Sequence, residues 1–138
     1  MHDYISGIQQ VGIGVPDAQV SKLKYKELFG TSVQIFDDVA RATLMTQYTG
    51  GEIHERRAVL AMNLAGGGGF EIWQYKSRTP TGPAAPPVYG DYGINAPKIK
   101  CRDVAQAHAF YKKQNAWVTD IQTNPRGGSI ETGQRTQR

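Results

Sequence analysis

The sequence has little cysteine and no long apolar run. Cys101 is the single cysteine among 138 residues, which excludes an intramolecular disulfide and a zinc ribbon built on paired cysteines. A lone cysteine is also typical of a reducing compartment, so we expect a cytoplasmic protein. No apolar stretch approaches the roughly 18 residues that a membrane-spanning helix needs. The first residues lack the charged and apolar regions of a secretory signal.

Charge is moderate and slightly unbalanced. Charged residues make up 20% of the chain and hydrophobic residues 39%, which argues against wholesale disorder. The 16 lysines and arginines exceed the 12 aspartates and glutamates, for a formal net charge of +4. The basic residues are spread at helical or strand spacing, as on solvated faces, so we expect neither a nucleic-acid nor a membrane partner. The excess favours anionic small molecules as ligands.

Hydrophobic patterns in the first half predict a strand, a helix and three further strands. Apolar residues alternate with small or polar ones over 8–15, which is typical of a strand with one buried face. Asp17 is a candidate N-cap for an amphipathic helix over 18–29, and Gly30 is placed to end that helix. Strands are predicted over 31–39, 57–65 and 70–75, with a short extended piece over 40–48 and a hairpin turn over 66–69.

The chain divides into four segments by composition and pattern. In the second half, strands predicted over 94–101 and 116–121 flank a helix over 104–114. Cys101 falls in the first of these strands, where we expect a small buried hydrophobic residue and not a nucleophile. The segments are a first module over 5–76, a proline-rich linker over 77–90, a partial second module over 91–121 and a frayed polar tail over 122–138.

The two halves match at a constant offset of 86 residues. Asp17 matches Asp103 ahead of each helix, and Tyr25 matches Tyr111 within it. A strand, an aspartate, a helix and a tyrosine at one fixed offset indicate a structural duplication. The copy is partial, because the third and fourth strands of the first module would map beyond Arg138.

This organisation resembles the vicinal oxygen chelate superfamily, which includes glyoxalase I, the bleomycin-resistance proteins and extradiol dioxygenases. The resemblance rests on the segments Ile8 to Asp17, Tyr25 to Gly30 and Phe70 to Trp73, and it covers roughly residues 5–121. It implies an α+β fold of paired βαβββ modules, here one module and a partial second copy. The mixed sheets of this family curve around a cavity that usually holds a divalent metal.

The resemblance implies metal ligands at Gln10 on the first strand and Glu71 on the fourth. Strand parity supports this placement independently, because the apolar neighbours of both residues face the helix and side chains alternate along a strand. Gln10, Glu71 and Trp73 then share one concave face. Amide and carboxylate oxygens suit hard or borderline divalent ions, with Zn, Ni, Co and Mn as candidates. In the second half Gln10 maps to Ala96, which cannot coordinate a metal.

The resemblance implies a metal-dependent lyase or isomerase of the glyoxalase kind, acting on a small substrate such as a thiol conjugate. Glu71 would be the catalytic carboxylate that moves a proton between adjacent carbons, and Trp73 would be a wall of the substrate pocket. Two alternatives stay open: a non-enzymatic small-molecule binding or resistance protein of the same fold, and an inactive relic without a metal. In both, Gln10 and Glu71 are only a polar pair on the sheet.

Three further expectations concern groups outside this pair. His54 lies in a predicted loop, where a surface histidine is the simpler interpretation. Arg56 and Arg57 either clamp a substrate carboxylate or are exposed charges where a strand begins. The incomplete second module leaves sheet edges unpaired, and unpaired edges recruit other chains, so we expect a homodimer.

Overall fold

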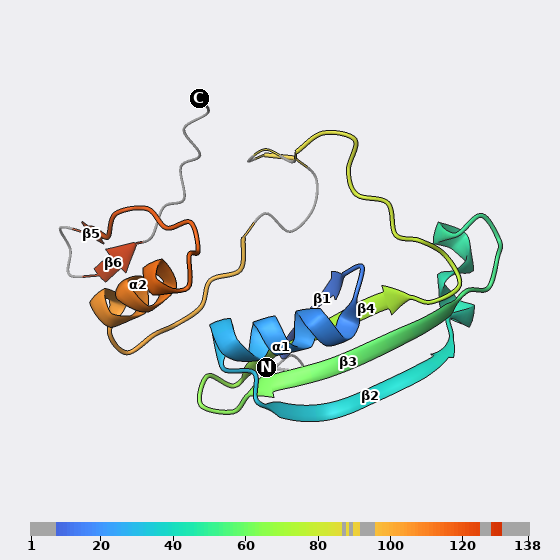
Figure 1. The fold of residues 1–138 in the computed structure, drawn as a ribbon, viewed down its shortest axis with the longest axis horizontal. Helices are drawn as coiled ribbons and strands as arrows, with labels where there is room; N and C mark the ends of the chain where they lie inside the picture. The colour runs from blue at the N-terminus through green and yellow to red at the C-terminus, as the bar shows by residue number, and fades with distance from the viewer. Residues whose placement is uncertain (1–7, 87, 89, 92–95, 125–127, 131–138) are drawn as a thin grey trace, which may run out of the picture. The chain divides into compact units, whose positions relative to one another are not determined.

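The computed structural model describes residues 8–86, 88, 90–91, 96–124 and 128–130 (Figure 1). The chain forms two units that divide between residues 89 and 90, at the end of the predicted linker. The first unit contains a sheet with one α-helix, and the second contains an α-helix and a short hairpin. Among the described helices, none combines the length and the hydropathy that a membrane span requires.

The first unit has the predicted order of one strand, one helix and three strands, and the α+β class is confirmed. The prediction of an extended piece over 40–48 is wrong beyond Arg41, because the chain turns there into a 3-10 helix. The turn is fixed at Ala42, which is buried and donates its N–H to the carbonyl of His54 at 2.8 Å. The elements are β1 (Gln10–Gly14), α1 (Ala18–Phe29), β2 (Val33–Arg41), η1 (Thr43–Tyr48), β3 (Glu55–Asn63) and β4 (Gly68–Tyr75).

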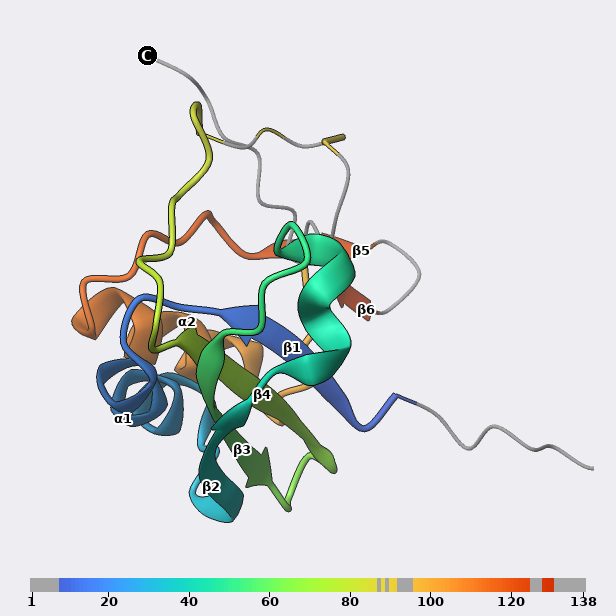
Figure 2. The ribbon, with the colours of Figure 1, turned by 90° about the vertical axis from the view of Figure 1, so that its right-hand side faces the viewer.

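The four strands form one curved, open sheet in the order β1-β4-β3-β2 (Figure 2). β1 runs parallel to β4, whereas the β4–β3 and β3–β2 pairs are antiparallel. The registers place Gly12 opposite Glu71, and Glu71 opposite Leu60. Directly opposite residues share a face of a sheet, so these three residues lie on the same side.

Helix α1 covers the other face of the sheet. Asp17 accepts hydrogen bonds from the N–H groups of Gln19 and Val20 at 2.8 and 2.9 Å, which satisfies donors of the first turn. Gly30 ends the helix with a φ of 65°, a conformation that favours glycine. The core between helix and sheet consists of Ala18, Tyr25 and Phe29 from α1 with Val11, Ile13, Val59, Phe70 and Ile72 from the strands.

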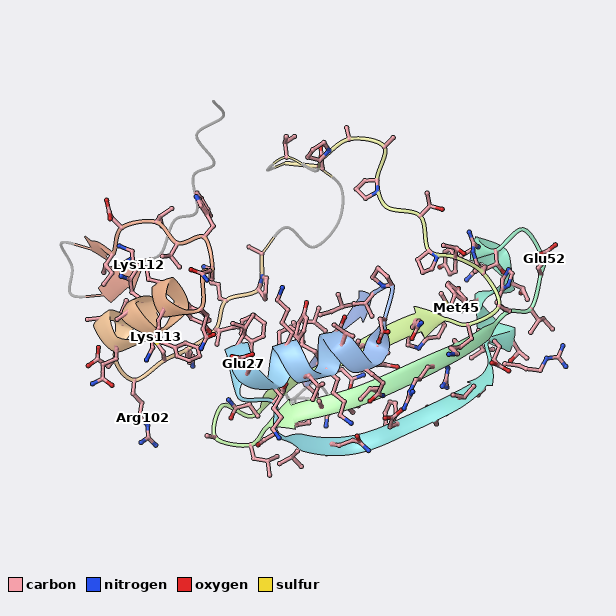
Figure 3. The ribbon with its side chains drawn as sticks, in the orientation of Figure 1. Glu27, Met45, Glu52, Arg102, Lys112 and Lys113 are labelled. Atoms are coloured by element: carbon pink, nitrogen blue, oxygen red, sulfur yellow. The ribbon has the colours of Figure 1, made fainter. Side chains whose placement is uncertain are left out.

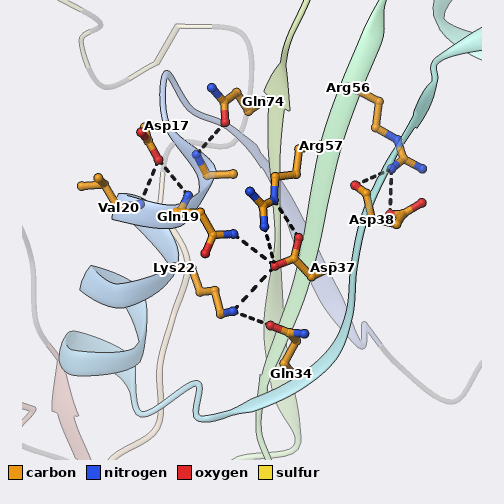
Figure 4. Close-up of polar contacts among 11 residues, drawn as sticks. Asp17, Gln19, Val20, Lys22, Gln34, Asp37, Asp38, Arg56, Arg57 and Gln74 are labelled. Atoms are coloured by element: carbon orange, nitrogen blue, oxygen red, sulfur yellow. Dashed lines mark hydrogen bonds and ion pairs between the residues drawn. The ribbon is translucent and has the colours of Figure 1, made fainter.

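A polar network links α1 to β2 and β3 beside this core (Figure 4). Arg57 on β3 donates to both carboxylate oxygens of Asp37 on β2, at 2.7 and 3.0 Å. Gln19 on α1 donates to the same carboxylate at 3.1 Å, and Lys22 forms an ion pair with it at 3.7 Å. The hydrogen bonds from Arg57 hold the pKa of Asp37 below its ordinary value, although burial acts in the opposite direction. The network therefore fastens the helix to the edge strand.

The helix of the second unit begins in the same way as α1. Helix α2 (Val104–Lys113) follows Asp103, whose side chain accepts the N–H of Gln106 at 2.9 Å. The φ and ψ of Asp103 are −139° and 110°, and those of Asp17 are −138° and 112°. The match between the two aspartates in the sequence thus extends to the backbone conformation of the two caps.

The strands predicted on either side of α2 do not form. Residues 96–101 and 116–121 are not in strands, and residues 94–95 lie outside the described part. A strand needs hydrogen bonds from a neighbouring strand, and within the described ranges neither segment pairs with a strand. Cys101 is exposed, so the prediction that it is buried is wrong. The unit instead has an antiparallel hairpin within the predicted polar tail, formed by β5 (Gln122–Asn124) and β6 (Gly128–Ile130).

Candidate functional site

The side chains of Gln10 and Glu71 meet on the face of the sheet that α1 leaves uncovered. Gln10 Nε2 donates a hydrogen bond to Glu71 Oε2 at 2.6 Å, although the two residues are 61 positions apart in the chain. Gln10 begins β1 and Glu71 lies in β4, the strand that pairs with it. Both side chains are half-buried. The predicted convergence of the two residues is confirmed.

Strand alternation explains why these two residues share a face. Val11 and Ile13 of β1 pack against the core under α1, as do Phe70 and Ile72 of β4. The residues between them must point to the other side of the sheet. The apolar positions of the two strands, which face the helix, therefore determine where the polar pair lies.

A hollow of about 310 Å³ opens beside the pair. Its floor includes Gly12 and Gly14 of β1, where an added Cβ would meet no atom within 4 Å. The glycines thus leave space that any other residue would fill. Met45 of η1, labelled in Figure 3, also lines the hollow, and Figure 2 shows η1 and α1 on opposite sides of the sheet. The lining residues are Gly12, Ile13, Gly14, Met45, Glu71 and Trp73.

Aromatic residues continue the site along β4. Trp73 lines the hollow, and its ring meets the ring of Tyr75 edge-on with centroids 5.3 Å apart. The guanidinium of Arg56 lies 5.9 Å from the centroid of the Trp73 ring. Because Arg56 also donates to Asp38 at 2.7 Å, its charge is already paired. Among the described residues that line the hollow, Glu71 is the one that carries a carboxylate.

Comparison with protein-family models, curated proteins and solved structures finds no match. The resemblance to the vicinal oxygen chelate superfamily accordingly rests on the sequence segments alone.

The donor atoms of the pair fit part of a metal's coordination shell. Glu71 offers a carboxylate, and Gln10 offers an amide oxygen if the amide turns over. A cation would replace the hydrogen bond between them, because it would need Gln10 Oε1 where Nε2 now faces the carboxylate. Within the described residues no group of three or more histidines, cysteines, aspartates or glutamates is placed to hold an ion. The pair therefore supplies two ligands, and the remaining ligands must come from elsewhere.

The two arginines that were candidates for a substrate clamp are both engaged within the sheet. Arg57 is bound to Asp37 on the face that α1 covers, and Arg56 is bound to Asp38. Each donates to a carboxylate on the neighbouring strand β2. Neither arginine therefore offers an unpaired charge to a substrate carboxylate.

His54 is more closely held than a surface loop residue. Its Nδ1 lies 3.1 Å from the Ser77 hydroxyl, and its Nε2 lies 3.4 Å from a carboxylate oxygen of Glu52. The ring also meets Tyr75 edge-on, at 5.6 Å between centroids. Ser77 in turn accepts the backbone N–H of Glu55 at 2.9 Å. These contacts fasten the segment after η1 to the end of β4.

Sequence reasoning missed the residues that create the hollow. Gly12 and Gly14 have no side chain that could bind or react, and the sequence analysis gave them no role. Met45 lies in the segment for which an extended conformation was predicted, and its approach to the site depends on η1. A signal was present in β1, because two glycines on one face of a strand often mark a close approach to a ligand.

Proposed function

We propose that the face carrying Gln10 and Glu71 is the metal-binding half-site of a glyoxalase-like lyase or isomerase of the vicinal oxygen chelate superfamily. The observation that carries the proposal is the contact between the two side chains at 2.6 Å beside an open, glycine-floored hollow. Two oxygen-bearing side chains so far apart in the sequence converge where a small molecule has room to bind.

Three residues of the chain have a role in this proposal: Gln10, Glu71 and Trp73. Gln10 and Glu71 would hold the ion through their oxygens, and a divalent ion bound there would supply a Lewis acid for an oxygen of the substrate. Glu71 has two carboxylate oxygens, so one can serve the ion while the other takes a proton from a substrate carbon and returns it to the neighbouring one. Trp73 forms the wall along which a small substrate, such as a thiol conjugate, lies.

A second copy of the chain completes the site. Divalent ions of this kind usually take more than two protein ligands, and one chain supplies two here. If the first units of two chains met about a two-fold axis, each chain would contribute one Gln10–Glu71 pair to the same ion. The outer strands β1 and β2 each have an unpaired edge within the described sheet, and such edges favour association. We therefore propose that the working form is a homodimer.

The lining of the hollow also supports a second candidate, a non-enzymatic binding protein of the same fold. Met45 and Trp73 give an apolar and aromatic surface that can bind a small molecule without any ion. In that case Glu71 accepts a hydrogen bond from the ligand, and the ligand's own chemistry is unchanged. The two candidates differ in metal content.

Elemental analysis of the purified full-length chain, after equilibration with Zn, Ni, Co or Mn and dialysis, tests the proposal. We expect one ion to be shared by two chains, and Glu71→Gln to lose it. Glu27→Gln is the matched control, because Glu27 is an exposed carboxylate on α1 whose loss removes the same charge. If wild type retains no ion, or if both variants retain it equally, the metal-dependent function is rejected. Retention of aromatic ligands without any ion would then favour the binding protein.

A further inference from the structure

A second hollow follows the first along the pairing of β1 with β4. Its volume is about 450 Å³, and Tyr75, which lines it, meets edge-on the ring of Trp73, which lines the first hollow. The pairing of β1 with β4 ends close to Trp73. Gly14 lies opposite Trp73 in the parallel register, and the N–H of the following residue, Val15, donates to the Trp73 carbonyl at 2.8 Å. The second hollow begins where β1 ends. It is lined by Pro16, Gln74, Tyr75, Lys76, Ser77, Arg78, Thr79 and Pro80.

This second hollow has unpaired positive charge. Lys76 and Arg78 both line it and are exposed, and within the described residues neither has a carboxylate partner. Lys22, Arg56 and Arg57 differ, because each is paired with an aspartate. The Arg78 guanidinium lies 5.5 Å from the centroid of the Tyr75 ring, which positions it beside the aromatic row.

We propose that the second hollow binds the anionic group of the ligand, a carboxylate or a phosphate, attached to an apolar or aromatic body. The body lies along Tyr75 and Trp73, and the other end of the ligand reaches Glu71. This inference rests on the proposed function, since it concerns the far end of the molecule that the first hollow takes.

The distribution of charge determines the direction in which such a ligand binds. Lys76 and Arg78 attract the anionic group at one end, and a guanidinium can donate two hydrogen bonds to it. The carboxylate of Glu71 repels the same group at the other end. The aromatic edges of Trp73 and Tyr75 between them favour an apolar body. A ligand with an anionic group at one end only is therefore oriented with its other end at the Gln10–Glu71 pair.

Titration calorimetry with three probes tests the inference on the full chain without added metal. The probes are 3-phenylpropionate, phenyl phosphate and the neutral 3-phenylpropanol. We expect at least one of the two anions to bind about tenfold more tightly than the alcohol, as for a charge-assisted contact. Comparison of the two anions then identifies the group that the subsite prefers.

Paired charge variants locate the effect. Lys76→Gln with Arg78→Gln should remove the preference for the anions over the alcohol. Lys24→Gln with Arg41→Gln should preserve it, because these exposed cations lie outside the hollow and their loss changes the net charge equally. Equal binding of all three probes by wild type, or a preference that survives in the first double variant, would overturn the inference.

Glu71→Gln separates this inference from the proposed function. The variant loses the metal ligand but keeps both cations, so it should still prefer the anions. If the wild-type chain takes no metal and yet shows the preference, the anion subsite stands and the metal-dependent function falls. If metal binds at Glu71 and the chain binds the anions no more tightly than the alcohol, the metal-dependent function stands and the anion subsite is rejected.

Discussion

Gln10 donates a hydrogen bond of 2.6 Å to the carboxylate of Glu71 between the parallel strands β1 and β4. The donor is a neutral amide and the acceptor an acidic side chain, and both are half-buried. Gln10 is the one side-chain partner of Glu71 in the part of the chain that the structure describes. The two residues should therefore depend on each other for stability.

A double-mutant cycle measures that dependence. Gln10→Ala leaves a half-buried carboxylate without its donor, so we expect the free energy of unfolding to fall by about 1 kcal/mol. In a Glu71→Ala background the same change should cost much less, giving a coupling energy of about 1 kcal/mol. Urea denaturation of the four proteins gives the values. Strictly additive losses would mean that the contact contributes nothing.

The glycine floor of the hollow allows a substitution that blocks binding without harming the fold. Gly12→Val points its side chain into open space, and a β-branched residue suits a strand better than glycine does. We expect the free energy of unfolding to be equal or higher, and the affinity for 3-phenylpropanol to fall by about tenfold or more. Calorimetry measures the affinity for the probe, and urea denaturation measures the free energy of unfolding.

Gly69 provides the contrasting control for that experiment. It lies opposite Met62 on β3, and an added Cβ would overlap the Met62 side chain and the Ala61 carbonyl. Gly69→Ala should therefore lower the free energy of unfolding by about 1–3 kcal/mol, as overpacking does. If the Gly12→Val variant bound the probe as tightly as wild type does, the ligand would have to bind outside this hollow.

The network around Asp37 predicts a loss of stability in acid. Its pKa is held below the ordinary value by the hydrogen bonds from Arg57, so the ionised form stabilises the folded state. This contribution is fully present above the ordinary pKa of an aspartate, about 4, and is lost as the pH falls through the lower folded value. Asp37→Asn should cost about 1–2 kcal/mol at pH 7 and progressively less below pH 4.

Urea denaturation of wild type and Asp37→Asn between pH 7 and pH 2.5 gives the comparison. Asp38→Asn is the control, because Asp38 is paired with Arg56 at a more exposed position. Its effect should be smaller, as for a surface ion pair. A difference between wild type and Asp37→Asn that stays constant across this range would contradict the assignment.

Local pattern was enough to predict much of the first unit. The alternation around Gln10 and Glu71 determined which way both side chains face, and the N-cap at Asp17 was readable from its residue type and position. Both inferences depend on neighbours in the sequence. The convergence of the pair needed one further assumption, that the two strands belong to one sheet, and the register supports it.

Several errors concern features that depend on partners elsewhere in the chain. The residues before and after α2 have a strand-like pattern, but a strand forms only against a neighbour, and in the described ranges they have none. Cys101 is exposed for that reason. Met45 lines the hollow from η1, which begins where the hydrogen bond from Ala42 to His54 extends the pairing of β2 with β3, a contact that no local pattern reveals.

The position of β1 at the margin of the sheet has a further consequence for the proposed site. In the described sheet this strand is held by a single ladder, on the side of β4. Fraying of β1 would carry Gln10 away from Glu71 while the helix-covered core stayed intact. Any molecule that needs both side chains must then bind more tightly as β1 becomes better ordered, and by thermodynamic reciprocity its binding protects the amides of β1 from solvent exchange.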